Sequence, residues 1–190
     1  MARDFAKTIE GSMFDFELYY LNVAEWIPSP ARIVEVGLGH GKSCIFLVEA
    51  ILNLGKEIER FIAVDSCAYG GASQRNAIIR NLVMSGVGDQ IEFLEISSLD
   101  ASTKFPDGYF NYIFLDSSHE YYQTKSEIKL WYHKLLHDGL LAGHDIFSSE
   151  NPGVGQAVKE LIPEHRLMTS KTRDGSGIWS VVKNDNLPCF

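Results

Sequence analysis

The sequence has few cysteines and few basic residues, and each shortage narrows the class of protein. The three cysteines, Cys44, Cys67 and Cys189, are odd in number and share no metal-ligand spacing, which favours free thiols in a reducing compartment. Lys and Arg number 17 against 25 Asp and Glu, which gives a net charge of -8. The protein therefore lacks the excess of positive charge that attracts nucleic acids. No apolar run has the length of a signal peptide core or a membrane span. We therefore expect a cytoplasmic protein with neither nucleic acid nor membrane as partner.

The length of 190 residues is typical of one domain, and 45% hydrophobic residues are enough to build its core. We expect a single domain over 1–190, with a helical segment over 1–29 and the folded core over 30–183. Aromatic residues in the first segment indicate a helix, namely Phe14, Phe16, Tyr19, Tyr20 and Trp26. This helix fits a substrate lid, a part of the core or a homodimer contact equally well.

Five short apolar runs indicate strands. They are "RIVEVG" (32–37), "FIAVD" (61–65), "IEFLE" (91–95), "YIFLD" (112–116) and "GLLAGHD" (139–145). Most of these runs are apolar at consecutive positions, which is typical of parallel strands covered on both faces.

Helical spacing separates the apolar runs. Apolar residues recur at i, i+3, i+4 and i+7 within 44–51, 128–135 and 154–161. Near the end of the chain, 165–170 and 178–183 indicate two strands joined by the Gly-rich "KTRDGSG". The pattern predicts an α/β fold with a doubly wound, Rossmann-like sheet that is mostly parallel and ends in an antiparallel hairpin.

The first expected strand runs into "EVGLGHGKSC" (35–44), which is close to three kinds of nucleotide-binding loop. A triphosphate loop, G-x-x-x-x-G-K-[ST], needs glycine where the chain has Val36. A dinucleotide loop, G-x-G-x-x-G, needs its third glycine where the chain has Lys42. The pattern E-x-G-x-G-x-G is complete and favours S-adenosylmethionine. Its members are Glu35, Gly37, Gly39 and Gly41.

The second expected strand ends in Asp65. An acid at the tip of the second strand is placed to accept both ribose hydroxyls of an adenosine cofactor. Glycine-rich turns between strand and helix also occur for steric reasons alone, so the loop by itself leaves a purely structural role open. Asp65 and the terminal hairpin together favour a cofactor site over that alternative.

On these motifs the chain resembles the class I S-adenosylmethionine-dependent methyltransferases over roughly residues 30–183. It is similar in particular to the metal-dependent small-molecule O-methyltransferases, which include catechol and macrolide-sugar O-methyltransferases and shade into the cephalosporin hydroxylases. The resemblance implies a seven-stranded sheet, S-adenosylmethionine as cofactor, and a hydroxyl substrate of sugar, catechol or polyketide type. It also implies that Ser97 and Ser98 contact adenine.

Two further expected strands end in acids, Asp116 and Asp145. Ligands of doubly wound sheets bind at the carboxyl ends of the strands, so neighbouring strands would bring both carboxylates together beside the cofactor. Asp116 is therefore expected to contact the cofactor as well as a cation. Carboxylate oxygens suit Mg²⁺ or a similar divalent cation, which would hold the substrate hydroxyl and lower its pKa. Either acid alone would read as a helix cap or a turn residue.

Two histidines complete the expected site. His119 lies three residues after Asp116, the offset at which the resembled O-methyltransferases carry their general base, and an imidazole can take a hydroxyl proton near neutral pH. His144 directly precedes Asp145, where the sugar-modifying relatives often carry an acid, and is the expected third metal ligand. His133 and His137 are expected on the solvated face of one helix.

Three functions stay open from the sequence. The first is a cation-assisted O-methyltransferase that uses S-adenosylmethionine, with His119 as general base. The second is a non-catalytic S-adenosylmethionine-binding protein whose metal site is degenerate. The third is a cephalosporin hydroxylase-like enzyme on the same scaffold.

Overall fold

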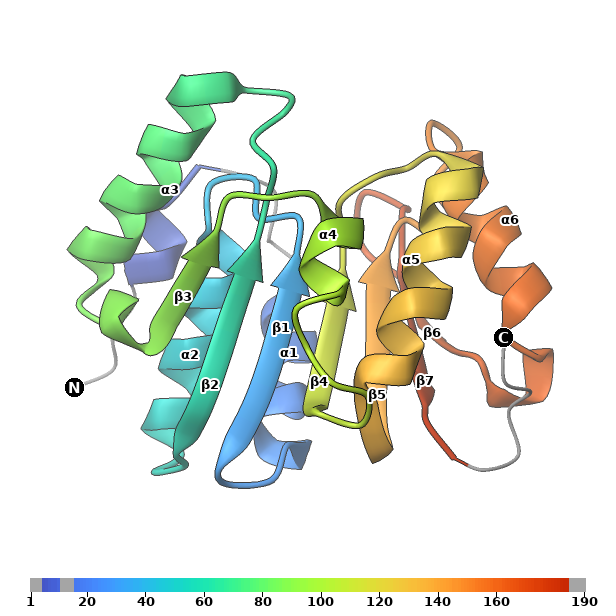
Figure 1. Ribbon diagram of the computed structural model, residues 1–190, viewed down its shortest axis with the longest axis horizontal. Helices are drawn as coiled ribbons and strands as arrows, with labels where there is room; N and C mark the ends of the chain where they lie inside the picture. The colour runs from blue at the N-terminus through green and yellow to red at the C-terminus, as the bar shows by residue number, and fades with distance from the viewer. Residues whose placement is uncertain (1–4, 11–15, 185–190) are drawn as a thin grey trace. The chain divides into compact units, whose positions relative to one another are not determined.

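Strands and helices alternate along the chain in the computed structural model, which describes residues 5–10 and 16–184 (Figure 1). They group into two units, Met1–Ser97 and Ser98–Phe190. Among the described residues, the first unit contains three strands and the second contains four. The predicted fold class is confirmed, because the described residues contain seven strands that are mostly parallel and become antiparallel at the C-terminal end.

The first unit is built on three parallel strands with β2 in the middle. They are β1 (Ala31–Val36), β2 (Ile58–Val64) and β3 (Ile91–Leu94). Val64 pairs with Val36 on one side and with Leu94 on the other, so the carboxyl ends of the three strands lie level. The loops that follow β1 and β2 therefore leave the sheet at the same edge.

Helices join these strands and cover them. They are α1 (Phe16–Trp26), α2 (Lys42–Asn53) and α3 (Gly71–Ser85), with short turns η1 (Phe5–Thr8) and η2 (Gly88–Gln90). In α1, which packs against α2, Tyr20 is fully buried and its ring lies 6.5 Å from that of Phe46, whereas Leu18 is 69% exposed. One side of the aromatic helix is thus part of the core. Phe14 lies outside the described residues.

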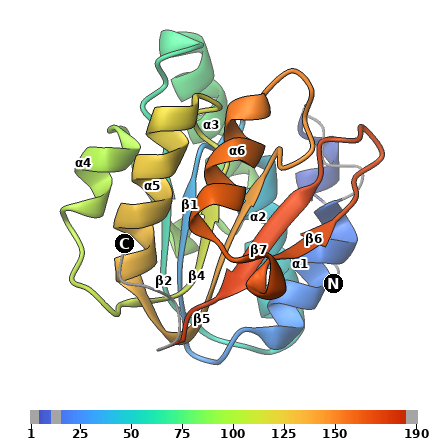
Figure 2. The same cartoon turned by 90° about the vertical axis from the view of Figure 1, so that its right-hand side faces the viewer.

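The second unit contains the antiparallel strands. β4 (Phe110–Leu115) runs parallel to β5 (Leu135–His144), whereas β7 (Ile178–Val182) runs antiparallel to both β5 and β6 (Met168–Ser170). The helices are α4 (Ser98–Ser102), α5 (Tyr121–Lys134) and α6 (Pro152–Leu161), with a short turn η3 (Glu164–Arg166). Figure 2 shows α5 and α6 next to each other on one face of these strands.

The beginning of β5 differs from the expectation. The strand was predicted to begin at Gly139, but it begins at Leu135, so the expectation that His137 lies on a helix is wrong. The polar stretch before Gly139 resembles a helix end, yet it stays in the strand through a local irregularity. Asp138 takes the left-handed conformation (φ 62°), and the pairing with β4 shifts register there.

Two further observations concern the chain as a whole. Among the described residues, no helix combines the length and the apolar character needed to cross a bilayer. Cys44 and Cys67 are buried free thiols, while Cys189 lies outside the described residues.

Candidate functional site

The glycine-rich loop joins β1 to α2 in a backbone conformation that residues with side chains rarely adopt. Gly37, Gly39 and Gly41 have φ angles of 86°, 53° and 81°, all in the left-handed region that favours glycine. The amide of Gly41 donates to the carbonyl of Leu38 at 2.7 Å, which closes a tight turn just before α2. A Cβ atom on Gly39 would meet nothing within 4 Å, so the backbone angle and not crowding requires glycine there. At Gly39 the loop therefore presents its backbone to open space.

Asp65 ties the loops after β1 and β2 to each other. Its carboxylate accepts the amide of Leu38 at 2.8 Å and the amide of Cys67 at 2.7 Å. The side-chain amide of Gln74, on α3, donates both to Asp65 at 3.2 Å and to the carbonyl of Gly39 at 3.3 Å. Because a carboxylate offers about four acceptor positions, three internal bonds leave room for about one ligand hydroxyl without rearrangement.

Glu35 is buried on β1 next to the start of α2. Only 1% of its surface is exposed, and its carboxylate accepts a hydrogen bond from the hydroxyl of Ser43. Ser43 lies in the first turn of α2, so this bond links the strand to the helix that follows the glycine loop. Glu35 therefore stabilises the glycine loop through its hydrogen bond to the first turn of α2.

Ser98 begins α4 and is buried in the second unit, whereas Ser97 is the last residue of the first unit. The indole nitrogen of the fully buried Trp131 donates to the Ser98 hydroxyl at 3.0 Å. Ser98 thus has a structural partner in α5 in addition to the adenine contact predicted for it.

Replacing Ser98 by Ala should lower the free energy of unfolding by about 1–3 kcal/mol, because the Trp131 N–H would stay buried without its acceptor. Urea unfolding at constant pH without cofactor measures the change. Ser149→Ala is the matched control at an exposed position and should change the free energy by less than about 0.5 kcal/mol. An equal effect of both substitutions would show that the buried bond contributes nothing.

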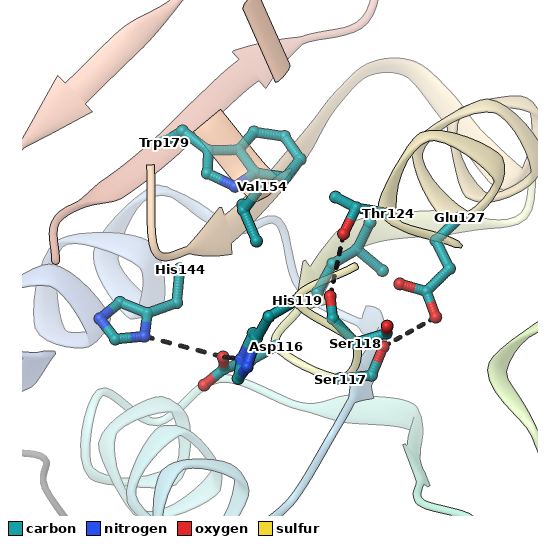
Figure 3. A pocket seen from close by; sticks show the side chains of 10 residues that line it. Asp116, Ser117, Ser118, His119, Thr124, Glu127, His144, Val154 and Trp179 are labelled. Atoms are coloured by element: carbon teal, nitrogen blue, oxygen red, sulfur yellow. Dashed lines mark hydrogen bonds and ion pairs between the residues drawn. The ribbon is translucent and has the colours of Figure 1, made fainter. Parts of the chain in front are cut away.

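The acids predicted at two strand ends lie together in the second unit. Leu115 pairs with Gly143 in the parallel β4–β5 register, so the residues that follow, Asp116 and His144–Asp145, emerge side by side. Donor atoms of Asp116, His144 and Asp145 all lie within 4.8 Å of one another. Figure 3 shows the His144 ring pointing toward Asp116. The three predicted metal ligands are thus close enough to share one cation.

His119 lies at the edge of this cluster. Its Nε2 is 3.0 Å from Asp145 Oδ2 and 3.8 Å from Asp116 Oδ1. The side chain is 43% exposed, whereas that of Asp145 is 8% exposed. An imidazole that is open to solvent and backed by a buried carboxylate can exchange a proton with a bound molecule.

Asp145 has a strained backbone. Its φ angle is 67°, which is uncommon for a residue other than glycine. Asn151, the residue that precedes α6, donates to its Oδ2 at 3.3 Å. Strained residues persist where the surroundings hold them and often occur at functional sites.

The charges of the cluster shift its pKa values. The carboxylate of Asp116, with a further contribution from Asp145, raises the pKa of His119 against the effect of burial. Burial lowers the pKa of His144, but Asp116 and Asp145 outweigh it and the net change is a rise. Burial also raises the pKa of Asp145, while the nearby imidazoles of His119 and His144 outweigh burial and lower the pKa of Asp116. The pKa of each of these two imidazoles and two carboxylates thus depends on the charges of the others.

A small pocket lies beside the cluster. Its volume of about 10 Å³ is room for about one water molecule. Trp179 and Val154 line it together with Asp116, His144 and Glu127 (Figure 3). Burial raises the pKa of Glu127, although the Ser117 hydroxyl donates to it at 2.7 Å.

Several contacts of the two clusters were missed from the sequence. The residues concerned are Gln74, Asn151, Asp174 and Ser176. Gln74 and Ser176 reach Gly39 and His144 across 35 and 32 residues, so no spacing along the chain reveals these contacts. Asn151 and Asp174 lie six and two residues from their partners, in turns that carry no recognisable motif. The Gly-rich stretch 171–177 was recognised only as a turn.

A family model described as a methyltransferase domain matches residues 34–146, which include the glycine loop and both acids. No curated protein sequence matches the chain.

Solved structures share the fold. A candidate O-methyltransferase from Klebsiella pneumoniae has a TM-score of 0.74 at 15% identity, covering 96% of this chain and 88% of that one. An O-methyltransferase from Bacillus cereus in complex with SAH has a TM-score of 0.69 at 17% identity, covering 92% and 83%. A candidate caffeoyl-CoA O-methyltransferase from Staphylococcus aureus has a TM-score of 0.69 at 16% identity, covering 96% and 90%. At such identities the similarity establishes the fold alone.

Proposed function

The chain belongs to the family of methyltransferase domains, and from this premise we propose that it transfers the methyl group of S-adenosylmethionine to a hydroxyl oxygen of a small molecule. A hydroxyl is proposed as the methyl acceptor because of the cluster of Asp116, His144 and Asp145, which has His119 at its edge. Carboxylates and an imidazole suit a divalent cation that holds an alcohol oxygen. The complex of the Bacillus cereus structure with SAH supports the choice of cofactor.

The glycine loop and Asp65 would hold the cofactor. The left-handed glycines leave the backbone open on the side where a Cβ atom of Gly39 would stand, and Asp65 has acceptor capacity left for a ribose hydroxyl. Glu35 would act through the loop by keeping the start of α2 in position. Ser97, Ser98 and Asp116 stay proposed cofactor contacts.

Asp116, Asp145 and His144 would hold the cation. The two carboxylate oxygens suit Mg²⁺ or Mn²⁺, whereas the imidazole nitrogen is a ligand that transition-metal cations accept more readily than Mg²⁺ does. When bound, the cofactor supplies an electrophilic methyl group and the cation lowers the pKa of the acceptor hydroxyl. His119 would accept the hydroxyl proton on Nδ1, because Nε2 faces Asp145 Oδ2 at 3.0 Å and carries the proton of the neutral ring there. The oxygen–methyl bond would form as the sulfur–methyl bond of the cofactor breaks, with S-adenosylhomocysteine as the leaving group. The imidazolium that results is stabilised by Asp145, whose Oδ2 lies 3.0 Å away.

The acceptor would be a small hydroxyl compound of catechol, sugar or polyketide type. The relative from Staphylococcus aureus, named for a caffeoyl-CoA substrate, supports an aromatic hydroxyl as the first to test.

Calorimetry with S-adenosylmethionine, repeated with Mg²⁺ and with EDTA, tests binding of the cofactor and of the cation. A panel of catechol, sugar and polyketide hydroxyls is then assayed for conversion of the cofactor to S-adenosylhomocysteine. We expect binding and cation-dependent turnover with one class of acceptor. Tighter binding of NAD or ATP than of S-adenosylmethionine would overturn the proposal, and cofactor binding without any turnover would favour the non-catalytic alternative.

Asp65→Ala should weaken S-adenosylmethionine binding by about 1.5–3 kcal/mol, the usual contribution of a hydrogen bond to a charged group. Calorimetry measures the change in affinity. Asp89→Ala is the matched control, because Asp89 is an exposed acid of the same unit in η2. If Asp65→Ala and Asp89→Ala bind the cofactor equally well, Asp65 is not the ribose ligand.

A further inference from the structure

The turn between β6 and β7 places polar side chains against the outer nitrogen of His144. The Ser176 hydroxyl lies 2.6 Å from His144 Nε2 and 2.6 Å from Asp174 Oδ1. Thr172 also donates to Asp174 Oδ1 at 2.6 Å, and its own oxygen accepts the amide of Gly177 at 2.7 Å. These bonds form a chain from the His144 ring to a carboxylate at the surface of the turn.

The donors and acceptors of this chain decide which nitrogen of His144 carries a proton. The carboxylate of Asp174 only accepts, and hydrogen bonds to a charged group are roughly twice as strong as neutral ones. The single hydroxyl proton of Ser176 is therefore directed to Asp174. The oxygen of Ser176 is then left with lone pairs alone toward His144, so Nε2 must be the donor in that contact.

Asp174 is well suited to this role. Hydrogen bonds from Ser176 and Thr172 lower its pKa to about 2, so it is a carboxylate throughout the physiological range. Ser176 and Thr172 are buried, which keeps water from competing for their hydroxyl protons.

The other ring nitrogen faces the acids. His144 Nδ1 lies 3.7 Å from Asp116 Oδ1 and 3.6 Å from Asp145 Oδ1. In the neutral ring a proton on Nε2 leaves a lone pair on Nδ1, the form in which an imidazole binds a metal. Without the turn, both carboxylates would instead attract the proton to Nδ1.

We infer that Ser176 and Asp174 are positioning residues that hold the proton of His144 on Nε2 and so leave the lone pair on Nδ1, the nitrogen nearer to Asp116 and Asp145. The value of this arrangement for cation binding rests on the proposed function, whereas the tautomer itself does not. Outer partners of this kind orient metal-ligating histidines, and their loss typically weakens metal binding about 10–100-fold.

The tautomer is read by long-range ¹H–¹⁵N NMR of the intact, cation-free chain, above the pH at which the same spectra show the ring to be neutral. His144→Gln identifies the signals of His144. We expect the parent to carry the proton on Nε2. Asp174→Ala should move it to Nδ1, because the Ser176 hydroxyl is then free to donate to Nε2. Asp174 is exposed, so this variant tests the inference without disturbing the core.

Three other variants complete the test. Ser176→Ala should shift the proton as Asp174→Ala does, whereas Ser176→Thr should restore the parent tautomer because it keeps the hydroxyl. Glu164→Ala removes one exposed negative charge from the same unit without touching the turn, and should leave the tautomer unchanged. A proton on Nδ1 in the parent, or a proton that stays on Nε2 in both Asp174→Ala and Ser176→Ala, would overturn the inference.

Titration with Mn²⁺, followed by electron paramagnetic resonance, measures how the tautomer of His144 affects cation binding. Asp174→Ala and Ser176→Ala should bind Mn²⁺ about 10–100-fold more weakly than the parent and than Glu164→Ala. If the parent binds no Mn²⁺, the cation-assisted part of the proposed function fails, while the NMR result still decides the tautomer. Unchanged Mn²⁺ affinity in both variants, with tight binding by the parent, would overturn the role of the turn in cation binding and leave the proposed function standing.

Discussion

His119→Ala should slow methyl transfer about 10²–10⁴-fold, the usual contribution of a positioned acid or base, while the affinity for cofactor and cation stays close to that of the parent. The His119 side chain is 43% exposed, and its Nε2 lies 3.0 Å from the buried Asp145 carboxylate. Removing the ring therefore removes the proton acceptor and leaves the three proposed metal ligands in place. Single-turnover rates with saturating cofactor and acceptor measure the effect.

The control for this substitution is His165→Ala, an exposed histidine in η3 of the same unit. It should retain the rate of the parent. If His119→Ala also retains that rate at all acceptor concentrations, another group takes the proton and His119 is not the general base.

The pH dependence follows from the direction of the pKa shift. Asp116 and Asp145 raise the pKa of His119, so in the cation-free chain NMR titration should give a value above the usual one of about 6.5. A bound cation neutralises these carboxylates and should lower the value again. Because the base acts in its neutral form, the rate should rise with pH through the pKa of the cation-bound state. In His119→Ala this rise should be absent.

Asp116→Asn and Asp145→Asn should each weaken Mg²⁺ binding by at least about tenfold. Loss of a residue that only hydrogen-bonds a metal ligand already weakens binding by about this factor, and these two residues are proposed as ligands themselves. Each removes a charged oxygen from a set whose donor atoms lie within 4.8 Å. Asparagine tolerates the left-handed backbone of residue 145, so the second variant changes the charge and keeps the turn. Activity should return in part at excess Mg²⁺, because affinity and not chemistry is impaired.

Asp107→Asn is the matched control, since Asp107 is an exposed acid of the same unit that pairs with Lys134 at 2.7 Å. It should leave the Mg²⁺ dependence unchanged. A parent that is indifferent to EDTA, together with full activity in both site variants, would refute the metal site. The proposal would then reduce to a methyltransferase that uses His119 without a cation.

The parts of the site that could be predicted are those encoded over short distances. The glycine spacing after β1 and the acids at the ends of β2, β4 and β5 belong to a strand and the residue or two that follow it. Parallel pairing places such strand ends at one edge, so Asp116 and Asp145 could be expected together before their register was known. The family follows from the same local features.

The rest depends on contacts between distant elements. Ser176 meets His144 from a turn 32 residues further along the chain, and Gln74 reaches Gly39 from α3 across 35 residues. The early start of β5 depends on its pairing with β4, which admits an irregular Asp138 that looks like a turn residue in isolation. None of these partners is marked by periodicity or spacing.

The left-handed backbone of Asp145 and its proposed role in cation binding place opposite demands on position 145. An L-residue in that conformation costs roughly 1–2 kcal/mol, which glycine would avoid. A laboratory selection for survival at high temperature should therefore enrich glycine at position 145 and, with the carboxylate gone, yield heat-resistant molecules that need excess Mg²⁺ for turnover. Heat-resistant variants that keep turnover at low Mg²⁺ would have to gain their stability elsewhere in the chain.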